Sequence, residues 1–187
     1  MNAIRNPIGV AALLSVAFVP IVCGSGATEK PGKNVMQLTS TAFNEGGAIP
    51  ARFTCDGSDA SPALKWIGAP SGAKSLALIA DDPDAPVGTW VHWVVYDLPV
   101  SANELPEDTP KSQYLPGGAK QGLNDFKRLG YGGPCPPPGK PHRYFFKLYA
   151  LDALLELKPG ANKKEVEHAM EKHILAQAQL MGTYKRK

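Results

Sequence analysis

The fold is decided by residues 75–98, which read SLALIADDPDAPVGTWVHWVVYDL. An apolar run over 75–80 and a second run over 90–98, rich in valine and aromatic residues, predict two β-strands. Between the runs, the prolines of the Asp-Asp-Pro-Asp-Ala-Pro segment end the first strand and restrict the backbone of the turn. We therefore expect two neighbouring strands whose connecting turn holds carboxylates in fixed directions.

The rest of the chain is also typical of a mainly β protein. Further strands are predicted over Met36–Ser40, Leu64–Ile67 and Tyr144–Leu151. Glycine and proline, at 19 and 18 of 187 residues, make up about a fifth of the chain, against roughly 12% in average proteins. Such frequent turn residues favour many short strands over long helices. The long stretch between Leu98 and His142 is predicted to be an ordered, functional loop.

One helix is expected near the C-terminus. Asn162 is a suitable N-cap, and Glu165 three residues later completes a variant of the capping box. Side chains at helical spacing continue to Gly182, which would end the helix. These side chains are Val166, Met170, His173, Ile174, Gln177, Leu180 and Met181.

Residues 1–27 are predicted to be a secretory signal peptide. Arg5 precedes an apolar run over 8–22, and small residues follow at 24–27, which is the order of a cleavable signal. The run is shorter than the roughly 20 residues that a membrane-spanning helix needs. Cleavage after Ala27 would leave a single domain over 28–187 in the periplasm or outside the cell. Acylation of Cys23, as in a lipoprotein, is the alternative.

The charge of the chain argues against nucleic acid as a partner. Its 20 Lys and Arg against 17 Asp and Glu give a net charge of +3, and the basic residues do not cluster as they do in nucleic-acid-binding proteins. The short basic run at 185–187 is typical of a solvated tail. No stable membrane span is expected in the mature chain.

Cys55 and Cys135 are the cysteines that remain after removal of the predicted signal peptide. In an oxidising compartment an even pair favours a disulfide. Two free thiols are the alternative, because the sequence does not give the separation of the two residues in space.

His92 lies within one of the predicted strands, in the segment Trp-Val-His-Trp over 90–93. Because side chains alternate between the faces of a strand, His92 is expected to share a face with Trp90, Val94 and Tyr96. A second histidine, His142, lies in the segment GPCPPPGKPHRY over 133–144. By the same alternation, it is expected to share a face with Tyr144, at the start of the next strand.

The order of these motifs resembles the phosphatidylethanolamine-binding protein family, also called the Raf kinase inhibitor proteins. DDPDAP at 81–86, HW at 92–93 and GPCPPPGKPHRY at 133–144 carry the resemblance. The segments FTCDG at 53–57, QGLNDF at 121–126 and LMGTY at 180–184 resemble the bacterial YbhB/YbcL branch of the family. The resemblance extends over nearly all of residues 36–186.

The resemblance implies an antiparallel β-sandwich with small peripheral helices and a small anion pocket at one end of the sheets. It assigns ligand binding to Asp82, Asp84, Pro86, His92, Gly133, Pro134, His142 and Tyr144. It also implies a cis peptide bond between Ala85 and Pro86, and it implies neither a cofactor nor a metal.

The chemistry of these residues agrees with an anion site. Imidazole, phenol and backbone N–H groups are the donors that a phosphate needs. The carboxylates of Asp82 and Asp84 would repel an anion, so we expect them to orient the histidine rings by accepting a hydrogen bond from one ring nitrogen. The sequence therefore favours a non-catalytic protein that binds phosphate-bearing or other small anionic ligands. It could also modulate a protein partner, as the kinase- and protease-inhibiting members of the family do.

Two enzymatic functions are the alternatives. Asp82, Asp84, His92 and His142 could hold a divalent metal in a hydrolase, although no general base is left over. Cys135 could act as a nucleophile with His142, although no helix N-terminus follows that would activate the thiol.

Overall fold

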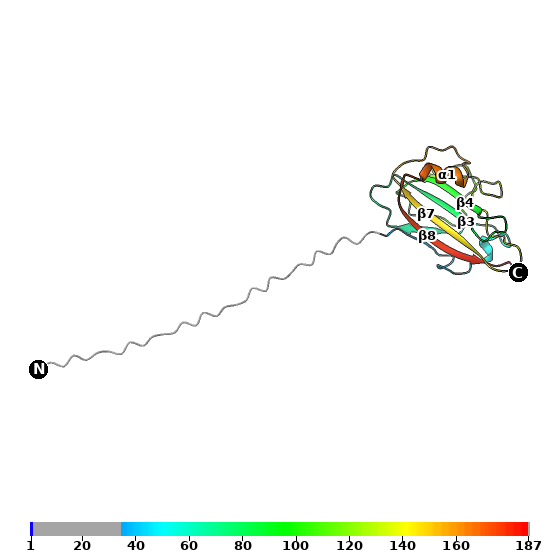
Figure 1. The fold of residues 1–187 in the computed structure, drawn as a ribbon, viewed down its shortest axis with the longest axis horizontal. Helices are drawn as coiled ribbons and strands as arrows, with labels where there is room; N and C mark the ends of the chain where they lie inside the picture. Colours follow the sequence, from blue (N-terminus) through cyan, green and yellow to red (C-terminus); the bar gives the residue numbers. More distant parts are fainter. Residues whose placement is uncertain (2–34, 187) are drawn as a thin grey trace. The chain divides into compact units, whose positions relative to one another are not determined.

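Two antiparallel β-sheets make up the fold. The structure is a computed structural model that describes residue 1 and residues 35–186. The smaller sheet has the strand order β1-β2-β5, and the larger sheet has the order β6-β4-β3-β7-β8 (Figure 1). The smaller sheet consists of β1 (Gln37–Ser40), β2 (Leu64–Ile67) and β5 (Glu104–Leu105). The larger sheet consists of β3 (Ser75–Asp82), β4 (Trp90–Leu98), β6 (Lys120–Gln121), β7 (His142–Leu151) and β8 (Ile174–Tyr184). The predicted mainly β class is confirmed.

The main core lies between the two sheets. Leu38 and Trp66 of the smaller sheet pack in one cluster with Leu78, Trp93 and Phe146 of the larger sheet. The opposite face of the larger sheet is also covered, because the helix α1 (Lys163–Met170) packs there. Figure 1 shows α1 lying over β4. Since both of its faces are covered, the central strand β3 is buried along its whole length, which explains its apolar run over residues 76–80.

The start of the predicted helix is confirmed. The Asn162 side chain accepts a hydrogen bond from the Glu165 backbone N–H at 3.1 Å, and the Glu165 carboxylate accepts one from the Asn162 N–H at 2.8 Å. These two bonds form a complete capping box at the N-terminus of α1.

The predicted end of the helix at Gly182 is wrong. The helix ends at Met170, and residues 174–184 form β8, which pairs with β7 over its whole length. The residues Ala176, Ala178 and Leu180 alternate with glutamines and pack toward the core between the sheets. This two-residue period competes with the helical spacing in the same segment, and pairing with the long strand β7 decides the outcome.

The predicted cis bond at Pro86 is also wrong, because every peptide bond of the described residues is trans. Residues 85–88 form a tight turn, closed by a hydrogen bond of 3.0 Å from the Gly88 N–H to the Ala85 carbonyl. Proline with its fixed φ suits the second position of such a turn in the trans form. Gly88 supplies a positive φ of 99° at the end of the turn.

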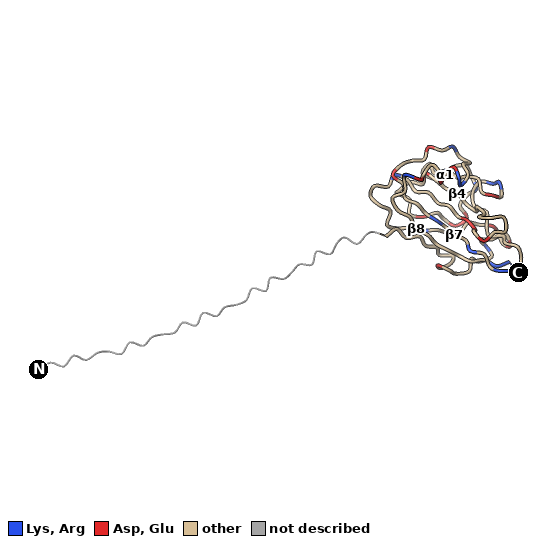
Figure 2. Tube along the Cα trace, viewed as in Figure 1, with Lys and Arg blue, Asp and Glu red and all other residues tan. Residues whose placement is uncertain are grey.

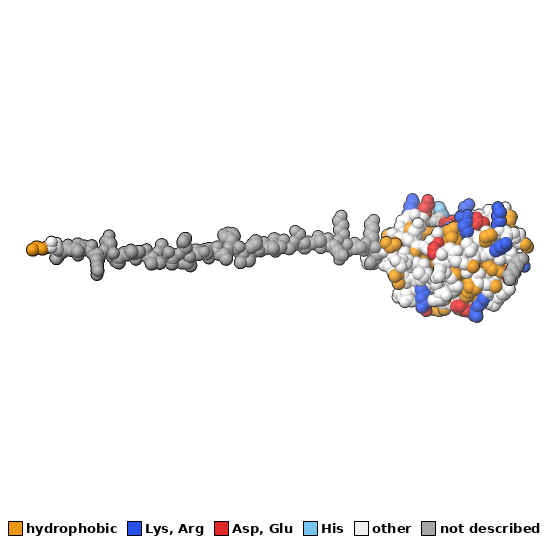
Figure 3. All heavy atoms as spheres, turned by 90° about the horizontal axis from the view of Figure 1, so that it is seen from below, with side chains coloured by type: hydrophobic (Ala, Val, Ile, Leu, Met, Phe, Trp, Pro, Cys, Tyr) orange, Lys and Arg blue, Asp and Glu red, His pale blue; other side chains and the backbone are white. Residues whose placement is uncertain are grey.

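Charged side chains of both signs are mixed over the described surface. Figure 2 shows Lys and Arg next to Asp and Glu along the loops and strands, and the space-filling view in Figure 3 shows the same mixture around hydrophobic side chains. No helix of the described residues is long and apolar enough to span a membrane. The predicted signal peptide, with Cys23, lies outside the described residues.

Candidate functional site

A cavity of about 210 Å³ opens where β3 ends and where β4 and β7 begin. Because the three strands are antiparallel neighbours, these ends meet at one edge of the larger sheet. The cavity is lined by Asp82, Ala85, Pro86, Val87, Trp90, His92, Phe126, Cys135, Pro136, Pro137 and His142. The turn after β3 and the loop before β7, which the sequence predicts to be functional, thus supply two of its walls.

Asp82 and His142 form a buried pair in this cavity. The His142 Nδ1–H donates to the Asp82 Oδ2 at 2.8 Å, and the side chains are only 4% (Asp82) and 11% (His142) exposed. The second carboxylate oxygen of Asp82 accepts the backbone N–H of Asp84 at 2.8 Å. The expected orienting role of Asp82 is therefore seen in the geometry: Nδ1 of His142 is held by the carboxylate, and Nε2 is left for a ligand.

His92 is held by the backbone instead of a carboxylate. Its Nδ1 lies 2.6 Å from the Gly132 carbonyl oxygen, which can only accept, so Nδ1 carries the proton. Burial lowers the pKa of His92 below its usual range, although the hydrogen bond to Gly132 and the charge of Asp82 oppose the shift. His92 is thus neutral at pH 7, and its Nε2 is a hydrogen-bond acceptor.

The expectation that His92 shares a face with Val94 and Tyr96 is wrong. The register of β4 on β3 passes from Trp93 opposite Ala80 to Val91 opposite Asp81, so that His92 is the extra residue of a β-bulge. The bulge resets the alternation. Val94 and Tyr96 pack on the helix-covered face, while the His92 ring lies against Tyr144, with ring centroids 5.2 Å apart.

Two buried donors near the cavity have no hydrogen-bond partner within the described residues. They are the indole N–H of Trp90, which lines the cavity, and the hydroxyl of Tyr144. Burial, with the nearby Asp82 charge, raises the pKa of Tyr144 well above its usual range, so the hydroxyl stays protonated. Folded proteins leave few buried polar groups unpaired, so these donors mark a place where a ligand can complete the hydrogen bonding.

An aromatic wall surrounds the polar groups. Phe126 packs edge-on against Trp90 and His92, with ring centroids 5.4 Å and 5.5 Å apart. Trp90 and Phe126 are site residues that were not predicted from the sequence. The position of Trp90, two residues before His92, could have indicated that it lines the site. Phe126 lies in a long loop, and the sequence does not predict which residues of that loop reach the cavity.

Four predicted site residues do not line the cavity: Asp84, Gly133, Pro134 and Tyr144, although the Tyr144 ring lies against His92. The Asp84 carboxylate accepts the backbone N–H of Arg143 at 2.9 Å and is bound by its guanidinium at 2.7 and 2.9 Å. This pairing lowers the pKa of Asp84 to about 2. The Gly133 N–H donates to Asp59 at 2.5 Å, and the Pro134 carbonyl accepts from Cys55 at 3.1 Å. Asp84, Gly133 and Pro134 therefore hold chain segments that adjoin the lining residues Ala85 and Cys135.

The two cysteines are joined, with an S–S distance of 2.09 Å and Cα atoms 5.4 Å apart. The structure therefore agrees with the predicted Cys55–Cys135 disulfide. Cys135 is at the same time part of the cavity wall. In this state its sulfur is not available as the nucleophile of the thiol alternative.

The metal alternative finds no support in the arrangement of ligands. Among the described residues, no three His, Cys, Asp or Glu side chains converge as a metal site requires. Asp82 is bound to His142, and Asp84 is bound to Arg143.

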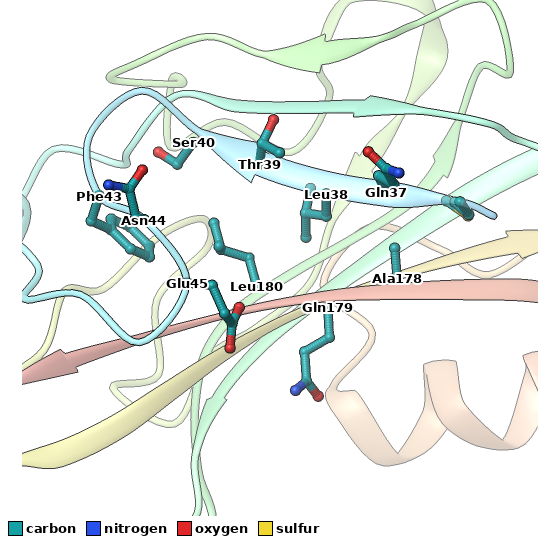
Figure 4. A pocket seen from close by; sticks show the side chains of 11 residues that line it. Gln37, Leu38, Thr39, Ser40, Phe43, Asn44, Glu45, Ala178, Gln179 and Leu180 are labelled. Carbon is teal, nitrogen blue, oxygen red and sulfur yellow. The ribbon is translucent and has the colours of Figure 1, made fainter.

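A larger cavity, of about 440 Å³, lies between β1 and β8 (Figure 4). Leu38, Phe43 and Leu180 supply its apolar surface, and Glu45 is the only titratable side chain that lines it. The Glu45 carboxylate accepts the backbone N–H of Met181 at 2.9 Å. The smaller cavity, which is lined by both histidines and by Trp90 with its unpaired indole N–H, is therefore the candidate site.

Comparison with protein families matches residues 39–185 to the family described as phosphatidylethanolamine-binding protein. Among curated proteins, a UPF0098 protein of Methanothermobacter thermautotrophicus is 55% identical over 151 residues, 81% of this chain and 99% of the relative. A UPF0098 protein of Aquifex aeolicus is 54% identical and covers 83% of this chain and 91% of the relative.

Solved structures show the same likeness. A phosphatidylethanolamine-binding protein homologue from Chlamydia trachomatis is 44% identical, with a TM-score of 0.75 over 82% of this chain and 99% of its own. Escherichia coli YbcL, described as a member of the mammalian PEBP family, is 36% identical, with a TM-score of 0.77 over 81% of this chain and 99% of its own.

Proposed function

The chain belongs to the phosphatidylethanolamine-binding protein family, and from this premise we propose that it is a non-catalytic protein that binds small, phosphate-bearing ligands in the cavity at the ends of β3, β4 and β7. The observation that carries the proposal is the pair of buried, unpaired donors, the Trp90 indole N–H and the Tyr144 hydroxyl. A buried donor without a partner costs about 1–3 kcal/mol. A phosphate oxygen is an acceptor that would remove this cost.

The two histidines complement these donors in different ways. His142, with Nδ1–H bound to the Asp82 carboxylate, leaves its Nε2 to face a ligand. His92 is neutral and presents Nε2 as an acceptor. The set therefore fits a phosphate that carries one proton: its oxygens accept from Trp90 and Tyr144, its hydroxyl donates to His92, and Nε2 of His142 faces the same ligand.

The composition of the cavity wall supports the non-catalytic part of the proposal. None of its lining residues is a serine, threonine or lysine, and Cys135 is held in the disulfide. A histidine without a neighbouring protein nucleophile supports ligand binding instead of covalent catalysis.

Calorimetry with inorganic phosphate and phosphoethanolamine tests the proposal. We expect His142→Ala to weaken binding by about 1–3 kcal/mol, the range for a hydrogen bond to a charged group. His168→Ala removes an exposed histidine of α1 and serves as the matched control, with unchanged affinity. Equal affinity of both variants, or hydrolysis of a phosphoester by the wild type, would contradict the proposal.

The proposal includes export and an effect on a protein partner. Val87, at the rim of the cavity, is 78% exposed, so a partner that docks there would meet both the rim and the bound ligand. N-terminal sequencing of the protein from its host should find a start near Thr28, and an intact Met1 would contradict export. Partner binding, measured by pull-down, should change when phosphoethanolamine is added.

A further inference from the structure

The Cys55–Cys135 disulfide differs from a buried disulfide that only stabilises the fold, because it is exposed to solvent and forms part of the wall of the candidate cavity. Both cysteines are exposed, and Cys135 also lines the candidate cavity. Exposed disulfides react with thiols more readily than buried ones. Access alone does not make an exchange site, so the surroundings of the two sulfurs decide the question.

The surroundings are asymmetric. A guanidinium nitrogen of Arg186 approaches the Cys135 Sγ at 3.9 Å, within reach of a weak hydrogen bond to sulfur. Asp56 holds this guanidinium in place, since its carboxylate accepts from the Arg186 Nε at 3.1 Å and from the Tyr184 hydroxyl at 2.7 Å. A positive charge beside a sulfur stabilises the thiolate that forms there. Cys135 is therefore the better leaving group of the two.

We propose that this disulfide is a thiol-exchange site at which a small thiol attacks Cys55. The thiolate attacks the Cys55 Sγ, the S–S bond breaks, and its electron pair stays on Cys135 as a thiolate facing Arg186. Cys55 then carries the small thiol as a mixed disulfide. A second thiol molecule can attack this mixed disulfide, which leaves both cysteines reduced and the small thiol oxidised.

Opening the disulfide frees one wall of the cavity. The chain up to Pro134 remains anchored, because Tyr131 donates to the Phe53 carbonyl at 2.8 Å, Gly133 donates to Asp59 and Cys55 donates to Pro134. Within the described residues, however, no hydrogen bond restrains Pro136 or Pro137, the next lining residues. The disulfide thus fixes this part of the wall, and exchange loosens it.

Mapping the products of thiolysis tests the chemistry. The native protein is treated with 2-mercaptoethanol, quenched with acid, alkylated with N-ethylmaleimide and analysed by peptide mass spectrometry. We expect the mercaptoethanol adduct on Cys55 and maleimide on Cys135, with opening faster than global unfolding. Arg186→Gln should slow opening about threefold or more, because it removes the charge that stabilises the leaving group, and the neighbouring Lys185→Gln should not. A native protein that resists the thiol, adducts mainly on Cys135, or equal rates in the two variants would overturn the proposal.

The effect on the cavity rests on the proposed function and has its own measurement. We expect the fully reduced protein, verified as folded by circular dichroism, to bind inorganic phosphate about threefold or more weakly than the oxidised protein, since a mobile wall must be ordered on binding. Equal affinity in the two states would overturn the coupling. Absence of phosphate binding in the oxidised state would instead contradict the proposed function and leave the exchange chemistry standing.

Discussion

The His142 ring donates from Nδ1 to the Asp82 carboxylate at 2.8 Å, and this bond joins the start of β7 to the end of β3. The two residues are far apart in the sequence, but antiparallel pairing of β3 with β7 brings their ends together. A second Asp–His pair, Asp152 with His173 at 2.7 Å, lies at the surface with side chains 47% and 43% exposed. The protein therefore contains its own control for the effect of burial on such a pair.

Asp82→Asn should destabilise the protein by about 1–3 kcal/mol. An amide has one oxygen where the carboxylate has two, so it cannot accept from both His142 and Asp84 as Asp82 does. His142 keeps a partner only by moving its proton to Nε2, and the charge-assisted bond is lost. Asp152→Asn should cost less than 1 kcal/mol, since exposed ion pairs contribute little. Urea unfolding of both variants at pH 7 gives the comparison. Equal losses would show that burial adds nothing to the Asp82–His142 bond.

Removal of the unpaired donors should have opposite effects on stability and binding. Tyr144→Phe and Trp90→Phe each delete a buried N–H or O–H that has no partner within the described residues. For Tyr144→Phe we expect a gain of up to about 1 kcal/mol in unfolding free energy and weaker binding of inorganic phosphate. Trp90→Phe should weaken binding in the same way, although its smaller ring offsets the gain in stability.

Tyr184→Phe is the control for these variants, because its hydroxyl donates to Asp56 at 2.7 Å at an exposed position. It should lower stability slightly and leave phosphate affinity unchanged. Tighter or unaltered phosphate binding by Tyr144→Phe would contradict its role as a ligand donor.

The sequence predicts the strands well where one signal acts alone. Leu64–Ile67 and Trp90–Leu98 have the predicted bounds, and the strand predicted over 75–80 continues two residues further, through Asp82. At 174–184 two periodicities compete, and only the neighbouring strand β7 decides between helix and strand. Local sequence could not supply that information, because the pairing partner lies some 30 residues earlier in the chain.

The sequence predicted which residues form the site better than it predicted how they are arranged. The motifs bring His92, His142 and Asp82 to one cavity, as the family resemblance implies. The β-bulge at His92 was not predictable from simple alternation, which requires a regular strand. The place of Asp84 outside the cavity also depends on a contact between two strands' ends, since Arg143 binds its carboxylate.

Gly182→Ala should destabilise the protein by about 1–3 kcal/mol through overpacking. A Cβ at Gly182 would lie 2.6 Å from the Ile49 Cγ1 and 2.8 Å from the Phe43 ring. Gly72→Ala is the control, because its Cβ would meet only Leu175 at 3.6 Å. Thermal unfolding of the two variants separates the effects. An unchanged midpoint for Gly182→Ala would mean that β8 can shift away from the core.

His92 should make the protein less stable as the pH falls below about 6.5, its ordinary pKa. Burial lowers the pKa of His92 in the folded state, so the unfolded chain takes up a proton first and is favoured. The stability that neutral His92 contributes is fully present above about pH 6.5 and is lost as the pH falls toward the pKa of His92 in the folded state. Urea midpoints between pH 7.5 and 5 measure it. His92→Gln, which does not titrate, should flatten the curve, whereas His168→Ala should not.

Protonation of Asp84 should cause a second loss of stability, at a lower pH than that caused by His92. Its hydrogen bonds with Arg143 lower the folded pKa to about 2, from an ordinary value of 3.8. A lowered pKa means that the folded state releases its proton more readily than the unfolded state. The resulting stability is therefore present above about pH 4 and disappears as the pH falls toward 2. The effect is small in size, because the Asp84 and Arg143 side chains are 28% and 54% exposed and solvent screens the pair.

Urea unfolding at pH 5 and at pH 2.5 measures the Asp84 contribution. We expect Asp84→Asn and Arg143→Gln to reduce the difference between the two midpoints by the same amount, because each variant removes the same pair. Added salt at pH 5 should narrow the gap between the wild type and Asp84→Asn. Lys65→Gln breaks the exposed pair with Glu104. In this variant the difference between the urea midpoints at pH 5 and pH 2.5 should stay close to that of the wild type. Arg143→Gln could leave the loss of stability at low pH unchanged while Asp84→Asn removes it. The lowered pKa of Asp84 would then arise from the backbone N–H of residue 143 and not from its guanidinium.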